Sequence, residues 1–241
     1  VGRRGQHRRH RRLVALRHVD ADQGQLVLAQ EGEGHVVAPA VAVDPGAAGD
    51  RQVQVHADVE DHAGGPQLPA RTLRALVEAA HAAALEVVVH AEGDGTVEAA
   101  VEAGADLLAH TPWTARLDDA LLRAAAGMTW ISTLDIHGWG SPAPEQEIAV
   151  DNLRRFRAYG GTVRYGTDLG NGPLVPGVNP REIRALQRAG LTPDEVLTAM
   201  TGDGAPPCWI PGGLTLDPAG FADVLATARV VGPEVRPRVP G

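Results

Sequence analysis

The sequence contains no lysine, because all 22 basic residues among its 241 positions are arginine. Mechanisms that need a Schiff-base lysine, a phosphate-binding P-loop lysine or a carboxylated lysine are therefore excluded. The single cysteine, Cys208, excludes an internal disulfide framework and favours a reducing compartment. We interpret it as a structural residue, because no activating partner stands beside it in the sequence.

Long apolar runs and aromatic residues are also scarce. No run reaches the roughly 18–20 apolar residues that span a bilayer, and no signal-peptide pattern opens the chain. Aromatic residues make up 3%, which argues against a stacking surface for nucleic acid. We therefore expect a cytoplasmic protein with no membrane or nucleic-acid partner.

Charge is unevenly distributed along a chain whose net charge is −8. Residues 1–12 hold six arginines, two histidines and no acidic residue, and the rest of the chain is strongly acidic. A basic arm of this kind suits phosphate contacts, but a disordered tail is the simpler interpretation. Residues 1–65 show no sustained period, although residues 52–59 alternate like a strand. A non-native reading frame or a truncation junction is a third hypothesis for this segment.

From residue 66 to residue 205 helical and strand patterns alternate. The predicted strands are residues 86–90, 105–110, 128–136 and 162–168. The predicted helices start near Leu68 and then cover residues 95–104, 116–127, 144–161, 179–190 and 192–201. Such alternation predicts a parallel sheet with crossover helices, and residues 206–241 form a tail.

Two parallel architectures compete, the open doubly wound sheet and the (β/α)8 barrel. No GxGxxG motif follows a first strand, so a dinucleotide-binding sheet has no support. His90, His110 and Asp168 each stand at the carboxyl end of a predicted strand. In a barrel such ends converge on one mouth, which favours an α/β fold built as a partial (β/α)8 barrel.

These three residues carry the predicted chemistry. Imidazole and carboxylate groups are good ligands for a divalent cation such as zinc. A cation of this kind acidifies bound water and polarises a carbonyl group. We predict that His90, His110 and Asp168 hold one divalent metal ion, and that Asp168 also accepts the proton of the water.

The sequence between Leu68 and Ala205 resembles the C-terminal half of the amidohydrolase superfamily, in its imidazolonepropionase-like and prolidase-like branch. The resemblance rests on VEAAHAAALEVVVHAEG, AVEAGADLLAHTPW, YGTDLGNG and NPREIRALQRAGLTPDEVLTAMT. It implies a metal-dependent hydrolase that cleaves C–N bonds in small molecules. By the same resemblance His90, His110 and Asp168 match the ligands after strands five, six and eight, and residues 212–228 look like the closing β-segment.

Two departures from the family pattern stand out. The chain has no HxH metal motif and no lysine to bridge two metals. If residues 52–59 are strand four, then Gln54 or His56 lies at the position of that lysine. The alternating region is also short for a complete barrel, which typically needs about 250 residues.

The remaining candidates lie close to the predicted mouth. His137 and Trp113 are predicted to bind substrate, and Asp135 has the same standing as His137. Thr167 is a candidate to orient the Asp168 carboxylate, and Asn171 suits a turn.

The leading hypothesis is an amidohydrolase-type, zinc-dependent hydrolase acting on a small-molecule amide or cyclic amide. The alternative is a truncated, inactive half-barrel that is only structural and forms homo-oligomers through its exposed sheet edges.

Overall fold

The computed structural model describes residues 25–27, 40–43, 52–56, 68–93, 95–170, 172–201 and 207–231. Within this part, seven strands form one sheet in which each strand pairs with its neighbours in sequence. The strands are β1 (Gln25–Val27), β2 (Ala40–Val43), β3 (Gln52–His56), β4 (Glu86–His90), β5 (Leu107–Leu108), β6 (Thr129–Ile131) and β7 (Thr162–Arg164). The pairs β1–β2 and β2–β3 are antiparallel, whereas β3 to β7 are parallel.

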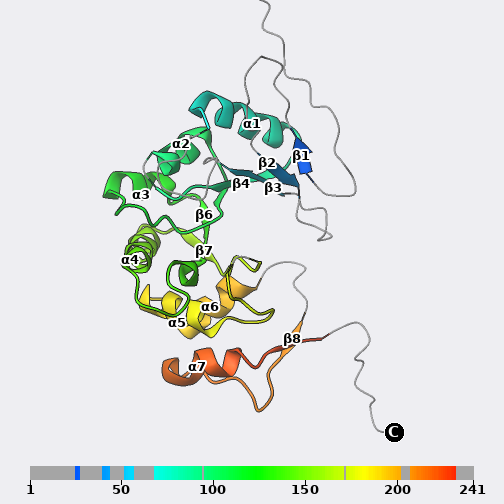
Figure 1. Cartoon of the computed structure of the whole chain (residues 1–241), viewed down its shortest axis with the longest axis vertical. Coiled ribbons are helices and arrows are strands. Elements are labelled where there is room, and N and C mark those ends of the chain that lie inside the picture. Colours follow the sequence, from blue (N-terminus) through cyan, green and yellow to red (C-terminus); the bar gives the residue numbers. More distant parts are fainter. Residues whose placement is uncertain are drawn as a thin grey trace, which may run out of the picture.

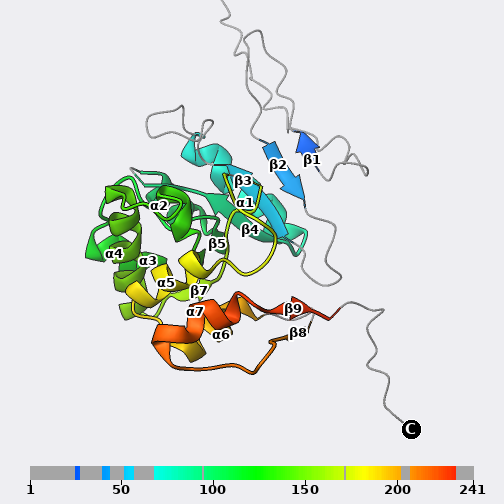
Figure 2. The ribbon, with the colours of Figure 1, turned by 60° about the horizontal axis from the view of Figure 1, so that its bottom comes forward.

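Each pair of parallel strands is joined through a helix. The helices are α1 (Ala70–Ala82), α2 (Thr96–Ala103), α3 (Asp119–Ala125) and α4 (Pro144–Ala158), followed by α5 (Pro180–Arg188), α6 (Pro193–Met200) and α7 (Pro218–Leu225). Figure 1 shows α1 to α4 in a row along one side of the strands, which follow one another down the molecule. Figure 2 shows α5, α6 and α7 stacked beyond β7. This arrangement confirms the predicted partial (β/α)8-type barrel.

The strands and helices meet in an aliphatic core. Val87 and Val89 of β4 are fully buried, as expected for a parallel strand covered on its faces. The indole ring of Trp130 in β6 stacks on Phe156 of α4, with ring centroids 3.9 Å apart. A Cβ atom on Gly161 would lie 2.2 Å from the Phe156 ring, so this aromatic stack requires glycine at position 161.

Local sequence rules account for the helix starts. Asn179 caps α5, its side chain accepting a hydrogen bond from the Arg181 backbone N–H group. The capping box predicted at the start of α6 is present, with Thr192 and Glu195 bonding each other's backbone N–H groups.

The predicted strands 105–110 and 162–168 are longer than β5 and β7. Two further predicted elements differ in kind from the structure. The predicted strand 128–136 is wrong beyond Ile131, because residues Leu134–His137 form a 3-10 helix, η1. The predicted β-segment 212–228 is also wrong over most of its length, because it contains α7. Asp217 caps that helix and Pro218 opens it, while Phe221 and Leu225 bury one helical face. A short antiparallel pair, β8 (Cys208–Trp209) and β9 (Arg229–Val230), flanks α7.

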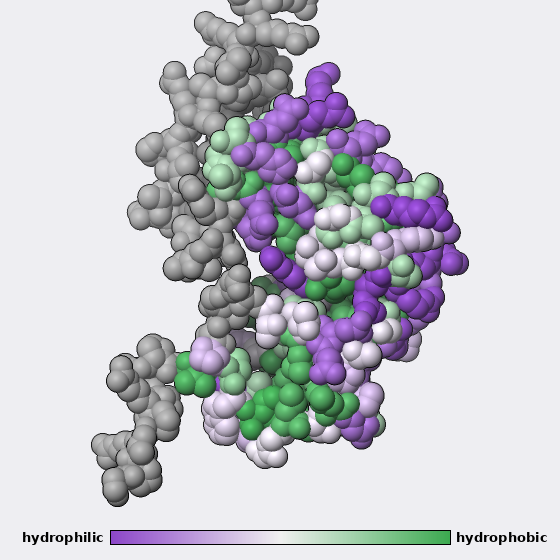
Figure 3. Space-filling view, turned by 180° about the vertical axis from the view of Figure 1, so that it is seen from behind, coloured by the Kyte–Doolittle hydropathy of each residue, from purple (hydrophilic) through white to green (hydrophobic). Residues whose placement is uncertain are grey.

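The surface is mostly polar over the helices. Figure 3 shows hydrophobic side chains gathered at the lower end of the molecule, where α7 lies in Figure 1. Leu214 and Leu216, which precede α7, are exposed, as is Cys208 in β8. None of the described helices is long and apolar enough to cross a membrane.

Candidate active site

A cleft of about 680 Å³ contains most of the predicted site residues. His90, which ends β4, lies on its wall with His110 and Asp168, which follow β5 and β7. The carboxyl ends of adjacent parallel strands lie at one edge of the sheet, so the topology itself collects these side chains.

His90 and His110 form the centre of the cleft. Both side chains are buried, and their rings meet edge to face with centroids 4.5 Å apart. Burial and the neighbouring His90 lower the pKa of His110 to about 4, against the opposing charges of Asp168 and Glu92. His110 is therefore a neutral imidazole near pH 7. Its Nδ1 atom lies 2.9 Å from the hydroxyl of Thr133. The other ring nitrogen, Nε2, is therefore the atom of His110 that could bind a metal ion.

Asp168 lies four positions beyond the last residue of β7, in a turn rather than on the strand. Its φ of 53° lies in the left-handed region, which non-glycine residues rarely adopt. Asp168 lines the cleft and its charge acts on His110, so the two groups share one environment. Thr167 beside it is half-buried, and its predicted orienting role stays a prediction. Asn171 lies outside the described residues.

Glu92 is a cleft residue that the sequence interpretation missed. It is buried, and its Oε1 atom lies 3.4 Å from Nε2 of His90. Burial raises the pKa of Glu92. Hydrogen bonding and charge from His90, with smaller effects of a Trp113 hydrogen bond and the His110 charge, outweigh burial and bring the pKa below its usual value. The available sequence signal was an acidic residue two positions after a strand-end histidine, in HAEG.

Trp113 and His137 both line the cleft, and their predicted role in substrate binding stays a prediction. Their ring centroids are 4.9 Å apart. Burial lowers the pKa of His137 to about 4, opposed by the charges of Glu92 and Glu145. Nε2 of His137 is a buried atom with no hydrogen-bond partner among the described residues.

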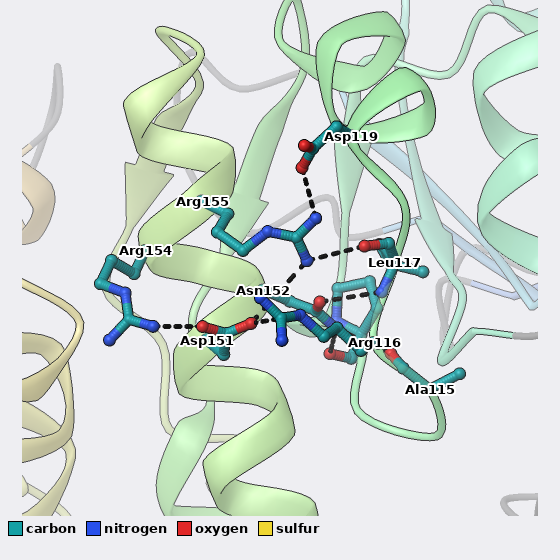
Figure 4. Close-up of polar contacts among 9 residues, drawn as sticks. Ala115, Arg116, Leu117, Asp119, Asp151, Asn152, Arg154 and Arg155 are labelled. Carbon is teal, nitrogen blue, oxygen red and sulfur yellow. Dashed lines mark hydrogen bonds and ion pairs between the residues drawn. The ribbon is translucent and has the colours of Figure 1, made fainter.

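Asn152 holds the loop that carries Trp113. This fully buried side chain accepts a hydrogen bond from the backbone N–H of Leu117 and donates to the carbonyl oxygens of Pro112 and Ala115. Figure 4 shows Asn152 reaching from α4 to this loop, with Arg155 binding the Leu117 carbonyl beside it. The loop is therefore fixed by a helix far along the chain.

Asp135 does not belong to the cleft, which corrects its predicted role. Its buried carboxylate accepts hydrogen bonds from Arg181 and from Asn179. Its backbone N–H donates to Oε2 of Glu182 over 2.7 Å. Asp135 therefore ties the η1 turn to α5 instead of facing a substrate.

The neighbouring strand β3 adds one more residue to the cleft. His56 pairs in register with His90, and Gln54 lines the cleft. Whether Gln54 or His56 takes the position of the family's bridging lysine depends on residues 52–59 being the fourth barrel strand, and stays a prediction. The side chain of His56 lies outside the described part of the structure.

The donor set suits a metal ion in its chemistry. His90 and His110 offer paired imidazoles, and Asp168 offers a carboxylate in the same cleft, which are ligands that zinc accepts. The three do not meet at one point: among the described residues, no group of three or more His, Cys, Asp or Glu side chains could hold a metal ion. The structure therefore brings two donors together and places the third on the same wall.

The chain is similar to known proteins in its three-dimensional structure. No protein-family model and no curated protein matches the sequence. An ochratoxinase from A. niger has a TM-score of 0.50 and 23% identity over 64% of this chain and 40% of its own. A prolidase complexed with N-methylphosphonate-L-proline has a TM-score of 0.51 and 20% identity over 72% of this chain and 50% of its own.

A third solved structure, a Xaa-Pro dipeptidase with bound methionine, has a TM-score of 0.50 and 19% identity. The alignment covers 61% of this chain and 41% of the dipeptidase, so this chain spans less than half of that protein. At these identities the likeness concerns the fold. The chain shares the fold of part of the ochratoxinase, prolidase and dipeptidase structures.

Proposed function

We propose that the chain is an amidohydrolase-type, metal-dependent hydrolase that cleaves a C–N bond, in an amide or cyclic amide, of a small molecule. The observation that carries the proposal is the buried pair His90 and His110, which shares one cleft with Asp168 at the carboxyl ends of parallel strands. The hydrolase structures that share the fold support this reaction class.

The roles of the residues follow from their chemistry. A divalent ion held by His90, His110 and Asp168, with zinc favoured by the donor set, would supply an acidified water and polarise the scissile carbonyl. Asp168 accepts the proton of the attacking water and returns it to the leaving nitrogen. Thr133 keeps the His110 ring in one orientation, and His137 with Trp113 contacts the substrate.

The alternative is a chain that binds no metal and has no turnover. It is favoured by one observation, the absence of a three-donor group among the described residues. The two hypotheses predict different amounts of metal bound per chain, and this amount can be measured without knowing the substrate.

The test compares the metal content of the purified full chain with that of a His90→Ala/His110→Ala double variant, using elemental mass spectrometry. His81→Ala is the matched control, because His81 is exposed on α1 and pairs with Asp106 away from the cleft. We expect about one divalent ion per chain in the wild type and in the control, and a loss of that ion in the double variant.

Equal metal content in the wild type and the double variant would overturn the proposal. If the expected loss of metal is observed, the metal-loaded wild-type chain is assayed for hydrolysis of N-acyl amino acids, proline dipeptides and lactams. Hydrolysis that disappears with the double variant and persists in His81→Ala supports the reaction class.

A further inference from the structure

The cleft is rich in carboxylate groups. Glu92, Glu145 and Asp168 all line it, and no arginine of the described residues does so. The chain has no lysine that could replace an arginine there. With Asp168 engaged in the reaction, Glu92 and Glu145 remain as carboxylates that face the substrate.

Arg181, whose side chain lies next to the residue after cleft-lining Trp139, is already bound. Arg181 lies beside Gly140, whose added Cβ atom would meet its Cδ at 2.9 Å. Its guanidinium, however, forms an ion pair with the buried carboxylate of Asp135, with Nη2 and Oδ2 2.8 Å apart. No described arginine forms an ion pair with Glu92 or Glu145. Apart from the proposed metal position, the cleft therefore has no described arginine to receive a carboxylate of a substrate.

The charges of Glu92 and Glu145 both act on the His137 ring, although the two residues lie in different parts of the fold. Glu92 follows β4, whereas Glu145 lies in the first turn of α4. Both carboxylates raise the pKa of His137, against the larger effect of burial, so both lie within electrostatic reach of that ring. His137 in turn contacts Trp113, with ring centroids 4.9 Å apart. Two negative charges and an indole ring therefore surround one region.

This combination is suited to an ammonium group. A cation within about 6 Å of an indole centroid is attracted by the negative face of the ring. Carboxylates beside the ring add charge-assisted hydrogen bonds, which are stronger than those between neutral groups.

We propose that the cleft takes substrates that carry a protonated amine, and that Glu92, Glu145 and Trp113 form the subsite for this ammonium group. The inference rests on the proposed hydrolase function and specifies the substrate class of its site. Molecules with a carboxylate in the ammonium position are disfavoured, because Glu92 and Glu145 repel it and no described arginine lines the cleft to bind it.

The experiment measures binding of three non-reacting probes that differ in charge and share a phenyl ring. These are 2-phenylethylamine, which is protonated at neutral pH, its uncharged N-acetyl derivative and the anion 3-phenylpropanoate. Affinities for the full chain are determined by ligand-observed NMR at low salt. We expect the ammonium probe to bind at least roughly fivefold more tightly than the other two, with a preference that falls in high salt.

Two variants on one helix locate the charge effect. Glu145→Gln removes one carboxylate of the subsite, whereas Glu147→Gln is the matched control, because Glu147 is exposed and pairs with Arg188 outside the cleft. We expect the first variant to reduce the preference for the ammonium probe about threefold or more and the second to leave it unchanged.

Equal binding of the three probes would overturn the inference, as would tighter binding of the anion or the absence of saturable binding up to about 20 mM. Equal effects of the two glutamine variants would also overturn it. This test measures binding and not turnover. The finding that the chain holds no metal or has no hydrolase activity would contradict the proposed function, but the binding of the three probes could still be interpreted.

Discussion

The hydroxyl of Thr133 lies 2.9 Å from Nδ1 of His110 and thereby joins the residues that follow two adjacent strands. Thr133 itself has a φ of 44°, an uncommon conformation for a β-branched residue. Its backbone N–H donates to the carbonyl of Gly166 and so holds the turn against the end of the next strand. The orientation of the His110 ring is therefore fixed by a strained residue of a neighbouring loop.

Thr133→Val is expected to weaken metal binding by roughly 10- to 100-fold, because it removes the partner that orients His110. Thr133→Ser keeps the hydroxyl and should retain most of the affinity. Competition with a chelator measures both values, and thermal unfolding checks that the variants fold. Wild-type affinity in Thr133→Val would show that the hydroxyl does not position a ligand.

His137 should make the fold sensitive to acid. Its pKa is about 4 in the folded chain, mainly because of burial, and near 6.5 when the chain is unfolded. Between these values the unfolded chain binds more protons, so this contribution to stability is complete above pH 6.5 and is lost towards pH 4. His137→Asn is expected to lose less stability than the wild type over that range in urea unfolding. His81→Asn, at an exposed position, is the control and should follow the wild type.

Glu182 should give the stability of the fold a pH dependence opposite to that from His137. Burial raises the pKa of this fully enclosed carboxyl from 4.5 to about 7. The unfolded chain therefore loses its proton first, and the contribution of Glu182 to stability declines as pH rises from about 4.5 to 7. Glu182→Gln keeps an acceptor for the Asp135 N–H group and should flatten this decline. An unchanged pH profile in urea unfolding would contradict the assignment.

Gly161→Ala tests the packing of the aromatic stack. The added methyl group would overlap the Phe156 ring, with contacts of 2.2 Å that only a shift of the ring or backbone can relieve. We expect a loss of about 1–3 kcal/mol in the free energy of unfolding. Gly127→Ala is the control, because its Cβ atom would meet nothing within 4 Å. Equal stability of the two variants would refute this account of the core.

Much of the fold follows from local sequence. The run EVVVH predicts the strand Glu86–His90 with correct bounds, because a short β-branched run suits a strand covered on both faces. Thr192 and Glu195 predict the start of α6 because a capping box acts within one turn. The helix α7 is absent from the prediction, which follows the resemblance over residues 212–228, although Asp217 and Pro218 form a local helix-start signal.

The candidate site was predictable only in part. His90, His110 and Asp168 share the cleft because strand-end positions converge in any parallel sheet, which periodicity reveals. Asn152 and Glu182 were missed because their partners lie far along the chain and depend on tertiary contacts. The ligand roles of the three predicted residues stay predictions.

The strictly sequential order of the sheet has a consequence for how the chain reaches its fold. Gln52 pairs with Glu86 and Thr129 with Thr162, so each strand finds its partner within one intervening helix. Short separations between paired segments reduce the entropy lost in closing each loop and speed folding. Each βα unit can therefore be added to the units already formed as the chain emerges during synthesis. The cleft is completed only when the segment after β7 delivers Asp168, so the site is among the last features to form.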